Sequence, residues 1–414
     1  MEIFERRESN VRGYCRAFPT VFAKAKNAVQ WDEKGKRYID FFAGAGVLLF
    51  GHNDEAMKTA MIEFLNNDGV AHSLDMYTPA KRKFLERFEE IVLNPRGLDY
   101  KMQFTGPTGT NCVEAALKLA RKVTGRRNVV AFTDAFHGMT LGSLACTGNR
   151  LFRNAAGVPL ENVIRVPFDG FAGSNVDSLE PLRAALADTS SGIEPPAAFI
   201  VETIQAEGGV NIASQEWLLG LQALARKYES LLIVDDIQVG CGRSGSFFSF
   251  EGTGLEPDLV CLAKGIGGFG TPLALLLIKP EHDKWAPSEH TGTFRGQGLS
   301  FIAGAEALNF FRDGKFMDEV KRKGEIIGAR LRGIASAHNG AMKVRGRGMI
   351  YGLDVGRGDL AGKVSRASFD NGLIVAPCGP DGRVLKLIPP LTIEDDVLTE
   401  GLDILERAVR AAAA

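Results

Sequence analysis

Short apolar runs alternate with amphipathic segments along the middle of the chain. The runs at 231–235 (LLIVD) and 259–262 (LVCL) are continuous and rich in branched residues, which is typical of strands buried on both faces of a sheet. In the segment 111–124, by contrast, apolar residues recur every three or four positions, and Gly125 follows as a helix stop. This alternation extends over residues 51–300 and predicts an α/β fold in which helices cover both faces of a mainly parallel sheet.

The pattern changes after residue 300, where long amphipathic helices alternate with apolar stretches broken by glycine. We expect residues 301–414 to form a smaller α+β domain beside a large domain of residues 51–300. Residues 1–50 contain a predicted hairpin with its turn at 33–35, and we expect this segment to join the smaller domain.

The balance of acidic and basic residues argues against nucleic acid or a membrane as the binding partner. Lys and Arg number 49 and Asp and Glu number 50 among 414 residues, for a formal net charge of -1. Without a positive excess, the chain has no bulk field to attract nucleic acid or an anionic membrane.

No apolar run approaches the ~20 residues of a membrane-spanning helix, and the first residues lack the apolar core of a secretory signal. The six cysteines are scattered along the sequence. We therefore expect a cytoplasmic protein that binds neither nucleic acid nor membrane.

Lys264 stands just after the apolar run 259–262 and directly before a glycine-rich bend. Open α/β sheets bind their ligands at the carboxyl ends of their strands, so this position favours a lysine that faces a ligand. Burial there would lower the pKa of the amine and make it a nucleophile, while a surface lysine that merely ends the strand is the alternative. The glycines of 265–270 also satisfy GxGxxG, but a strand pattern follows them instead of the helix that a dinucleotide site requires.

Asp235 and Asp236 end the other apolar run. A carboxylate at this place could bind a metal, act as a base, hold a protonated heterocycle or simply be solvated. No further Asp, Glu or His stands nearby in the sequence at metal-ligand spacing, so we expect no metal site.

A turn of small residues, Thr108–Thr110, leads into the helix predicted at 111–124. Free backbone N–H groups and the helix dipole favour an anion at such a turn, although an ordinary helix start looks the same. Phe136 and His137 follow a predicted strand, where an aromatic ring can stack on a planar ligand or pack in the core.

These features suit one ligand. The turn suits a phosphate, the aromatic residue a flat ring, the aspartate a protonated ring nitrogen and the lysine an aldehyde, and pyridoxal 5′-phosphate has all four groups.

The motifs TGTN, EAALKLAR, FHG, VETIQAEGG, LLIVDDIQ, GRSG, AKGIGG, GTFRG and PPL follow one another over nearly the whole chain. With them the sequence resembles the class III (ω-) aminotransferases, a branch of the fold-type-I pyridoxal-phosphate enzymes. The resemblance implies a large domain with a seven-stranded-type sheet and a smaller α+β domain. It also implies a transaminase that forms a homodimer, or a higher homo-oligomer, with active sites shared between subunits.

Carried over by position, the resemblance implies that Lys264 bonds covalently to the cofactor aldehyde and that Asp235 pairs with the ring nitrogen. Gln238 would approach the ring hydroxyl, and Thr293 would reach the phosphate of the cofactor in the partner subunit. Glu207 would lie near the substrate entrance. The other cofactor-binding residues that it implies are Gly109, Thr110, Phe136, His137 and Glu202.

Two departures from the family pattern bear on the substrate. Met139 stands where relatives that act on ornithine or 4-aminobutyrate carry an arginine, and Lys386 stands where many relatives carry another. Lysine offers a point charge and not a bidentate fork, so we expect the substrate carboxylate at Lys386 or at another base, Arg243 or Arg295. The resemblance implies transfer of the 4-amino group between L-2,4-diaminobutyrate and 2-oxoglutarate. Another donor (ornithine, lysine or 4-aminobutyrate) and an aminomutase or racemase reaction on the same scaffold are the alternatives.

Overall fold

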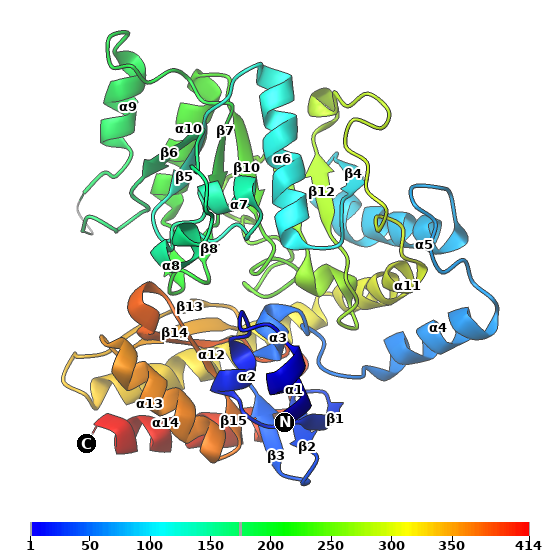
Figure 1. The fold of residues 1–414 in the computed structure, drawn as a ribbon, viewed down its shortest axis with the longest axis vertical. Helices are drawn as coiled ribbons and strands as arrows, with labels where there is room; N and C mark the ends of the chain where they lie inside the picture. Colours follow the sequence, from blue (N-terminus) through cyan, green and yellow to red (C-terminus); the bar gives the residue numbers. More distant parts are fainter. Residues whose placement is uncertain (1, 174–175, 414) are drawn as a thin grey trace.

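The computed structural model describes residues 2–173 and 176–413. At its centre is a seven-stranded sheet with the strand order β4-β12-β11-β10-β7-β5-β6 (Figure 1). Its strands are β4 (Lys101–Phe104), β5 (Val129–Phe132), β6 (Val163–Val166), β7 (Ala198–Val201), β10 (Leu231–Asp235), β11 (Leu259–Leu262) and β12 (Leu275–Ile278). Strand β12 runs antiparallel to both of its neighbours, whereas the pairs among β11, β10, β7, β5 and β6 are parallel. The prediction of a mainly parallel sheet is confirmed.

Helices cover both faces of this sheet because successive residues of a strand point to opposite sides. In β10, Leu231 and Ile233 join the apolar cluster under α6, whereas Leu232 and Val234 join the cluster that contains the apolar residues of α10. All five residues of β10 are buried, which explains why its sequence is continuously apolar up to Asp235. The helices between residues 55 and 307 are α4 (Glu55–Asn66), α5 (Pro79–Phe88), α6 (Gly109–Thr124), α7 (Leu141–Cys146), α8 (Arg150–Asn154), α9 (Glu180–Ala187), α10 (Gln215–Lys227) and α11 (Gly298–Ala307).

Two four-stranded sheets lie below the central sheet in Figure 1, with the orders β1-β2-β3-β15 and β13-β14-β17-β16. The predicted hairpin is present as the antiparallel pair β2–β3. Strand β3 also pairs with β15, where Ile39 lies beside Leu373, so the opening segment and the C-terminal segment share one sheet. The strands are β1 (Phe22–Lys26), β2 (Val29–Asp32), β3 (Arg37–Asp40), β13 (Lys343–Arg347), β14 (Ile350–Asp354), β15 (Leu373–Ile374), β16 (Ala376–Cys378) and β17 (Val384–Leu387).

The helices at the two ends of the chain pack around these smaller sheets (Figure 1). They are α1 (Glu2–Arg7), α2 (Tyr14–Ala17), α3 (Ala43–Gly46), α12 (Lys315–Ser336), α13 (Gly358–Asp370) and α14 (Asp395–Ala413), while a short pair, β8 (Ile204–Gln205) and β9 (Asn211–Ile212), follows β7. Over the described residues, no helix combines the length and the apolar character that crossing a lipid bilayer requires.

Candidate active site

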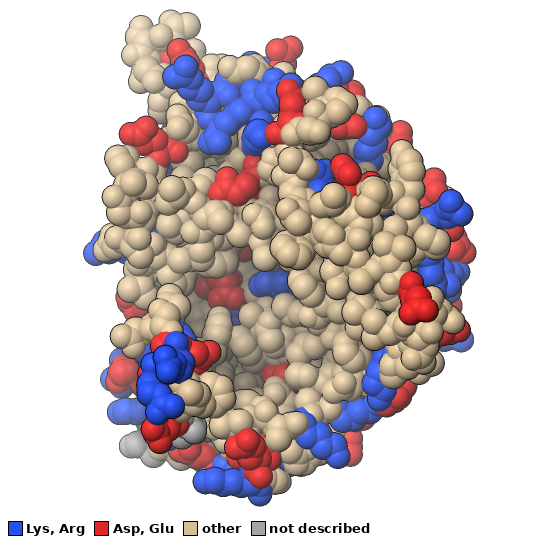
Figure 2. Space-filling view, turned by 45° about the vertical axis from the view of Figure 1, so that its right-hand side comes forward, with Lys and Arg blue, Asp and Glu red and all other residues tan. Residues whose placement is uncertain are grey.

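A cavity of about 250 Å³ opens at the carboxyl ends of β5, β10 and β11. Figure 2 shows the hollowed face of the molecule, in which a few acidic and basic side chains lie inside a mostly uncharged wall. Most of the residues that the sequence singled out line this cavity: Gly109, Thr110, Phe136, His137, Glu202, Glu207, Asp235, Gln238 and Lys264. They come from five separate stretches of sequence, which the parallel strands bring to one edge of the sheet.

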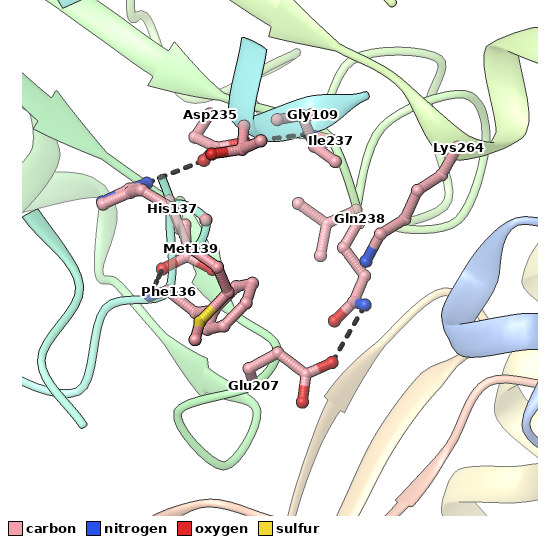
Figure 3. A pocket seen from close by; sticks show the side chains of 13 residues that line it. Gly109, Phe136, His137, Met139, Glu207, Asp235, Ile237, Gln238 and Lys264 are labelled. Atoms are coloured by element: carbon pink, nitrogen blue, oxygen red, sulfur yellow. Dashed lines mark hydrogen bonds and ion pairs between the residues drawn. The ribbon is translucent and has the colours of Figure 1, made fainter. Parts of the chain in front are cut away.

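Lys264 begins a single 3-10 turn, Lys264–Gly267, two residues after β11. Its φ angle is 53°, in the left-handed region that non-glycine residues rarely adopt and that is often found at functional sites. Its side chain points into the cavity (Figure 3). Removal from water lowers the pKa of Lys264 to about 8, although the nearby carboxylate of Glu207 opposes this shift. A minor fraction of neutral, nucleophilic amine is therefore present near neutral pH, far more than an ordinary lysine with a pKa of 10.5 would supply.

Asp235, the last residue of β10, is joined to His137 in the loop after β5. The distance from His137 Nδ1 to Asp235 Oδ2 is 2.7 Å (Figure 3). The backbone N–H of Ile237 donates to the other carboxylate oxygen at 3.2 Å. A carboxylate accepts hydrogen bonds and does not donate them, so the proton of this contact lies on Nδ1. The other ring nitrogen, Nε2, is buried and has no hydrogen-bonding partner among the described residues.

Glu202 flanks Phe136, and its Oε2 accepts the backbone N–H of Phe136 at 3.0 Å. Burial, reinforced by the charge of Asp235, raises the pKa of Glu202 well above its ordinary value. The ring of Phe136 meets that of Phe152 edge to face, with the centroids 5.8 Å apart. Glu202 thus holds the backbone of Phe136, and Phe152 packs against its ring.

Glu207, Lys386 and Gln238 form a connected group at the other end of the cavity. Lys386 Nζ contacts Glu207 Oε1 and lies 3.1 Å from Gln238 Oε1, while Gln238 Nε2 donates to Glu207 Oε1 at 3.0 Å and to the carbonyl of Ala45 at 2.9 Å. Burial alone would raise the pKa of Glu207, but the neighbouring Lys386 and Lys264 lower it to about 2. Burial likewise opposes the charge of Lys386, but Glu207 outweighs it and raises the pKa of Lys386. Both side chains are therefore charged.

Four predicted residues lie elsewhere in the single chain. Lys386 is 1% exposed and sits behind Glu207, outside the cavity wall. Arg295 lines a different cavity beside α5 and donates to the carbonyl of His290 at 2.8 Å, and the carbonyl of Thr293 meets His72 Nε2 at 2.7 Å. Arg243 is 0% exposed and donates to the carbonyls of Met349 and Pro389, so it does not face the cavity that holds Lys264.

The cavity wall also contains residues to which the sequence reasoning gave no role. Ile237 and Val239 flank Gln238 in the turn after β10, and Gly138 follows His137. Their proximity in sequence to Asp235 and His137 was a usable signal, because a tight turn brings each neighbour of a site residue close to the same space. Met139, singled out for the arginine it replaces, lines the wall and is 49% exposed.

The residues present fit pyridoxal phosphate on four points of the structure. Gly109 approaches Ile237 so closely that a Cβ there would lie 2.9 Å from its side chain, and Thr108, at the N-cap of α6, makes no side-chain hydrogen bond to the helix in the described structure. The N–H groups of this first turn thus remain available to an anion. Asp235 supplies a buried carboxylate and Lys264 a nucleophilic amine facing the same cavity. Among the described residues, no group of His, Cys, Asp and Glu is placed to hold a metal ion.

Residues 12–409 match the aminotransferase class-III family. The chain belongs to the class III aminotransferases. Its cofactor is pyridoxal 5′-phosphate, and the expected fold type I is confirmed. A diaminobutyrate–2-oxoglutarate transaminase of Sporosarcina pasteurii is 53% identical over 99% of this chain and 96% of its own length. The enzyme of the same name from Halomonas elongata is 50% identical over 99% of both chains.

Solved structures of other aminotransferases share the architecture of this class III aminotransferase. The ornithine aminotransferase of Toxoplasma gondii superimposes with a TM-score of 0.86 at 25% identity, over 100% of this chain and 94% of that one. An aminotransferase of Bacillus anthracis superimposes with a TM-score of 0.88 at 22% identity, over 99% and 97% of the two chains. The second likeness concerns the fold alone.

Proposed function

We propose that this aminotransferase transfers the 4-amino group between L-2,4-diaminobutyrate and 2-oxoglutarate, giving L-aspartate 4-semialdehyde and L-glutamate. The observation that carries the proposal is the identity of 50% to 53% over nearly the full length of several relatives named for this reaction. We propose further that it runs towards diaminobutyrate in the cell, as a step of ectoine synthesis.

Lys264 and Asp235 carry the chemistry in this proposal. Pyridoxal phosphate, when bound, supplies an electron-poor ring that accepts the electron pair left on the substrate carbon. Lys264 would hold the cofactor through Nζ; once the amino group of the substrate has taken its place, the freed amine would remove the proton from that carbon. Asp235 keeps a proton on the ring nitrogen, and His137 holds the Asp235 carboxylate in place through the 2.7 Å hydrogen bond.

The remaining wall residues position the ligands. The first turn of α6, at Gly109 and Thr110, binds the phosphate through its uncapped N–H groups. Phe136, whose backbone N–H donates to Glu202, would stack on the ring, and Gln238 would approach the ring hydroxyl.

The Glu207–Lys386 pair is proposed to receive the carboxylate end of the substrate. Lys386 is a cation beside the cavity, and its charge is balanced by Glu207. A dicarboxylate such as 2-oxoglutarate competes with Glu207 for Lys386, whereas the ammonium group of a diamino acid is attracted to Glu207 itself. Arg295 lines a different cavity of the same chain, so we propose that it would bind the substrate carboxylate from the partner subunit.

We propose a homodimer or a higher homo-oligomer with active sites shared between subunits. The segments 70–77 and 292–297 lie together, linked through His72 and Thr293, and expose Tyr77 (98%) and Phe294 (64%). Exposed aromatic residues of this kind are typical of a protein interface, and Thr293 would reach the neighbouring site from it. The free state of all six cysteines is consistent with a cytoplasmic location.

The domain division proposed from the sequence assigns residues 51–300 to the cofactor-binding domain and residues 301–414, with 1–50, to the smaller one. The pairing of β3 with β15 supports the grouping of the two chain ends.

A panel of amino donors tests the proposed substrate. The purified holoenzyme is incubated with 2-oxoglutarate and diaminobutyrate, ornithine, lysine or 4-aminobutyrate, and glutamate is measured. We expect the highest kcat/KM with diaminobutyrate and no glutamate without 2-oxoglutarate. Activity confined to the other three donors would contradict the substrate, and product formation without a keto acid would indicate an aminomutase or racemase.

A further inference from the structure

The loop that carries Phe136 and His137 is pressed against the first turns of α6. Gly138, with φ +130°, lies so close to Thr110 that a Cβ there would be 2.3 Å from Thr110 Oγ1. A Cβ at Gly142 would likewise lie 2.2 Å from Glu114 Oε2. Glycine at these two positions allows the loop and the start of α7, which follows it, to come into direct contact with α6.

A chain of hydrogen bonds crosses this contact. The hydroxyl oxygens of Thr110 and Thr140 are 2.7 Å apart, and Thr140 Oγ1 lies 2.5 Å from Glu114 Oε1. The backbone N–H of Ser143 donates to the same carboxylate oxygen at 3.0 Å, and Ser143 Oγ donates to the carbonyl of Thr110 at 3.1 Å. Glu114, in the second turn of α6, thus accepts hydrogen bonds from Thr140 at the N-cap of α7 and from Ser143 in the first turn of α7.

The direction of each hydrogen bond in this chain follows from the number of protons. A carboxylate of Glu114 accepts only, so the single hydroxyl proton of Thr140 is donated to it. Thr140 Oγ1 can then meet Thr110 Oγ1 only as an acceptor, and the hydroxyl proton of Thr110 points to Thr140. The backbone N–H of Thr140 also approaches Thr110 Oγ1 at 3.3 Å, which fixes that oxygen as its acceptor.

We infer that Glu114 is a positioning residue for the phosphate end of the cofactor site. Because Glu114 accepts the hydroxyl proton of Thr140, the Thr110 hydroxyl donates to Thr140 Oγ1, and the phosphate is left to the backbone N–H groups of the first turn of α6 and not to the Thr110 side chain. The inference rests on the proposed function, because it assigns the phosphate to this turn.

The test compares pyridoxal phosphate with pyridoxal, which lacks the phosphate. Equilibrium dialysis of the apoenzyme measures the Kd of both compounds for wild type, Glu114→Ala, Glu114→Gln and Thr140→Val. We expect Glu114→Ala and Thr140→Val each to weaken pyridoxal phosphate binding about 5- to 10-fold, the loss of roughly one hydrogen-bonded positioning contact, and to leave pyridoxal binding unchanged. Glu114→Gln should bind like wild type because its amide oxygen can still accept from Thr140 and Ser143.

The double variant Glu114→Ala with Thr140→Val should bind pyridoxal phosphate no more weakly than the weaker single variant, because both changes break the same chain of hydrogen bonds. Thr140 is exposed, so its variant should fold even if Glu114→Ala does not. Wild-type affinity in Thr140→Val, additive losses, or equal weakening for both compounds would overturn the inference. A wild-type apoenzyme that binds pyridoxal phosphate no better than pyridoxal would instead overturn the phosphate site of the proposed function.

Discussion

Asp235 and His137 are joined by a hydrogen bond of 2.7 Å at a place that water scarcely reaches, with side-chain exposures of 5% and 0%. The two residues lie 98 positions apart in the sequence, and the carboxyl ends of β5 and β10, which flank β7 in the central sheet, bring them together. An ionised carboxylate in such a setting acts strongly on any positive charge placed beside it, because little solvent screens the interaction.

Loss of the Asp235 charge should therefore remove most of the activity. We expect Asp235→Asn to lower kcat with diaminobutyrate about 100- to 1000-fold, the size usual for a lost electrostatic contact to a transition state. His137→Asn should retain more activity than His137→Ala, because the asparagine amide can replace Nδ1 as a donor to Asp235. Steady-state kinetics measures all three variants, and near-normal turnover in Asp235→Asn would contradict the assignment.

The pKa of Lys264 sets the pH dependence of cofactor attachment. Only the neutral amine attacks the aldehyde, so the rate at which the apoenzyme bonds to pyridoxal phosphate should rise with pH and level off above about 8, not near the ordinary value of 10.5. Lys264→Ala should bind the cofactor without a covalent bond, so borohydride reduction should add no mass to its peptide. Stopped-flow absorbance measures the rate in wild type.

Neighbouring charges should move that midpoint in opposite directions. Lys386 lowers the pKa of Lys264 and Glu207 raises it. We therefore expect Lys386→Met to shift the midpoint upward and Glu207→Gln to shift it downward. Shifts of the same sign in both variants would show that structural damage, and not charge, controls the rate.

Lys386 is predicted to anchor a carboxylate of 2-oxoglutarate. Lys386→Ala should raise the KM for 2-oxoglutarate at least about tenfold, since a hydrogen bond to a charged group contributes roughly 1.5–3 kcal/mol, and Lys386→Arg should restore most of the affinity. An unchanged KM in Lys386→Ala would exclude Lys386 as the anchor and direct attention to Arg295.

The same pair should also affect stability. Lys386→Met removes the cation that pairs with Glu207, whose side chain is 30% exposed at the cavity, so we expect a loss of about 1–3 kcal/mol of unfolding free energy, less than for a fully buried pair. The double variant Glu207→Gln with Lys386→Met should recover much of this loss, as measured by urea unfolding. A double variant no more stable than Lys386→Met would show that the two charges do not depend on each other.

Subunit association can be tested at Phe294, which is 64% exposed and meets the ring of His72 at 5.4 Å between centroids. Phe294→Asp places a charge in the proposed interface and should shift sedimentation from dimer to monomer while lowering activity. Leu219→Asp, at a 38% exposed position on α10, is the matched control and should remain dimeric. A monomeric wild type with full activity would contradict shared active sites.

Much of the fold and the central chemistry could be predicted because they depend on local patterns. The run 231–234 is apolar because both faces of β10 are covered. Asp235 ends the run because the strand ends there, at the edge of the sheet where the cavity opens. Lys264 follows the next buried run in the same way. Parallel strands bring such carboxyl ends to one edge of a sheet, so the convergence of Lys264 and Asp235 required no knowledge of packing.

Contacts between distant segments were decided only by the tertiary structure. Lys386 and Glu207 are 179 residues apart, and no period or spacing indicates that they pair behind the cavity wall. The burial of Arg243 beneath the carbonyls of Met349 and Pro389, which keeps it from the cavity, likewise depends on how the turn between β13 and β14 and the residues after β17 pack. Secondary structure follows from short-range periodicity, whereas the partner of a charged side chain depends on which surfaces meet when the chain folds.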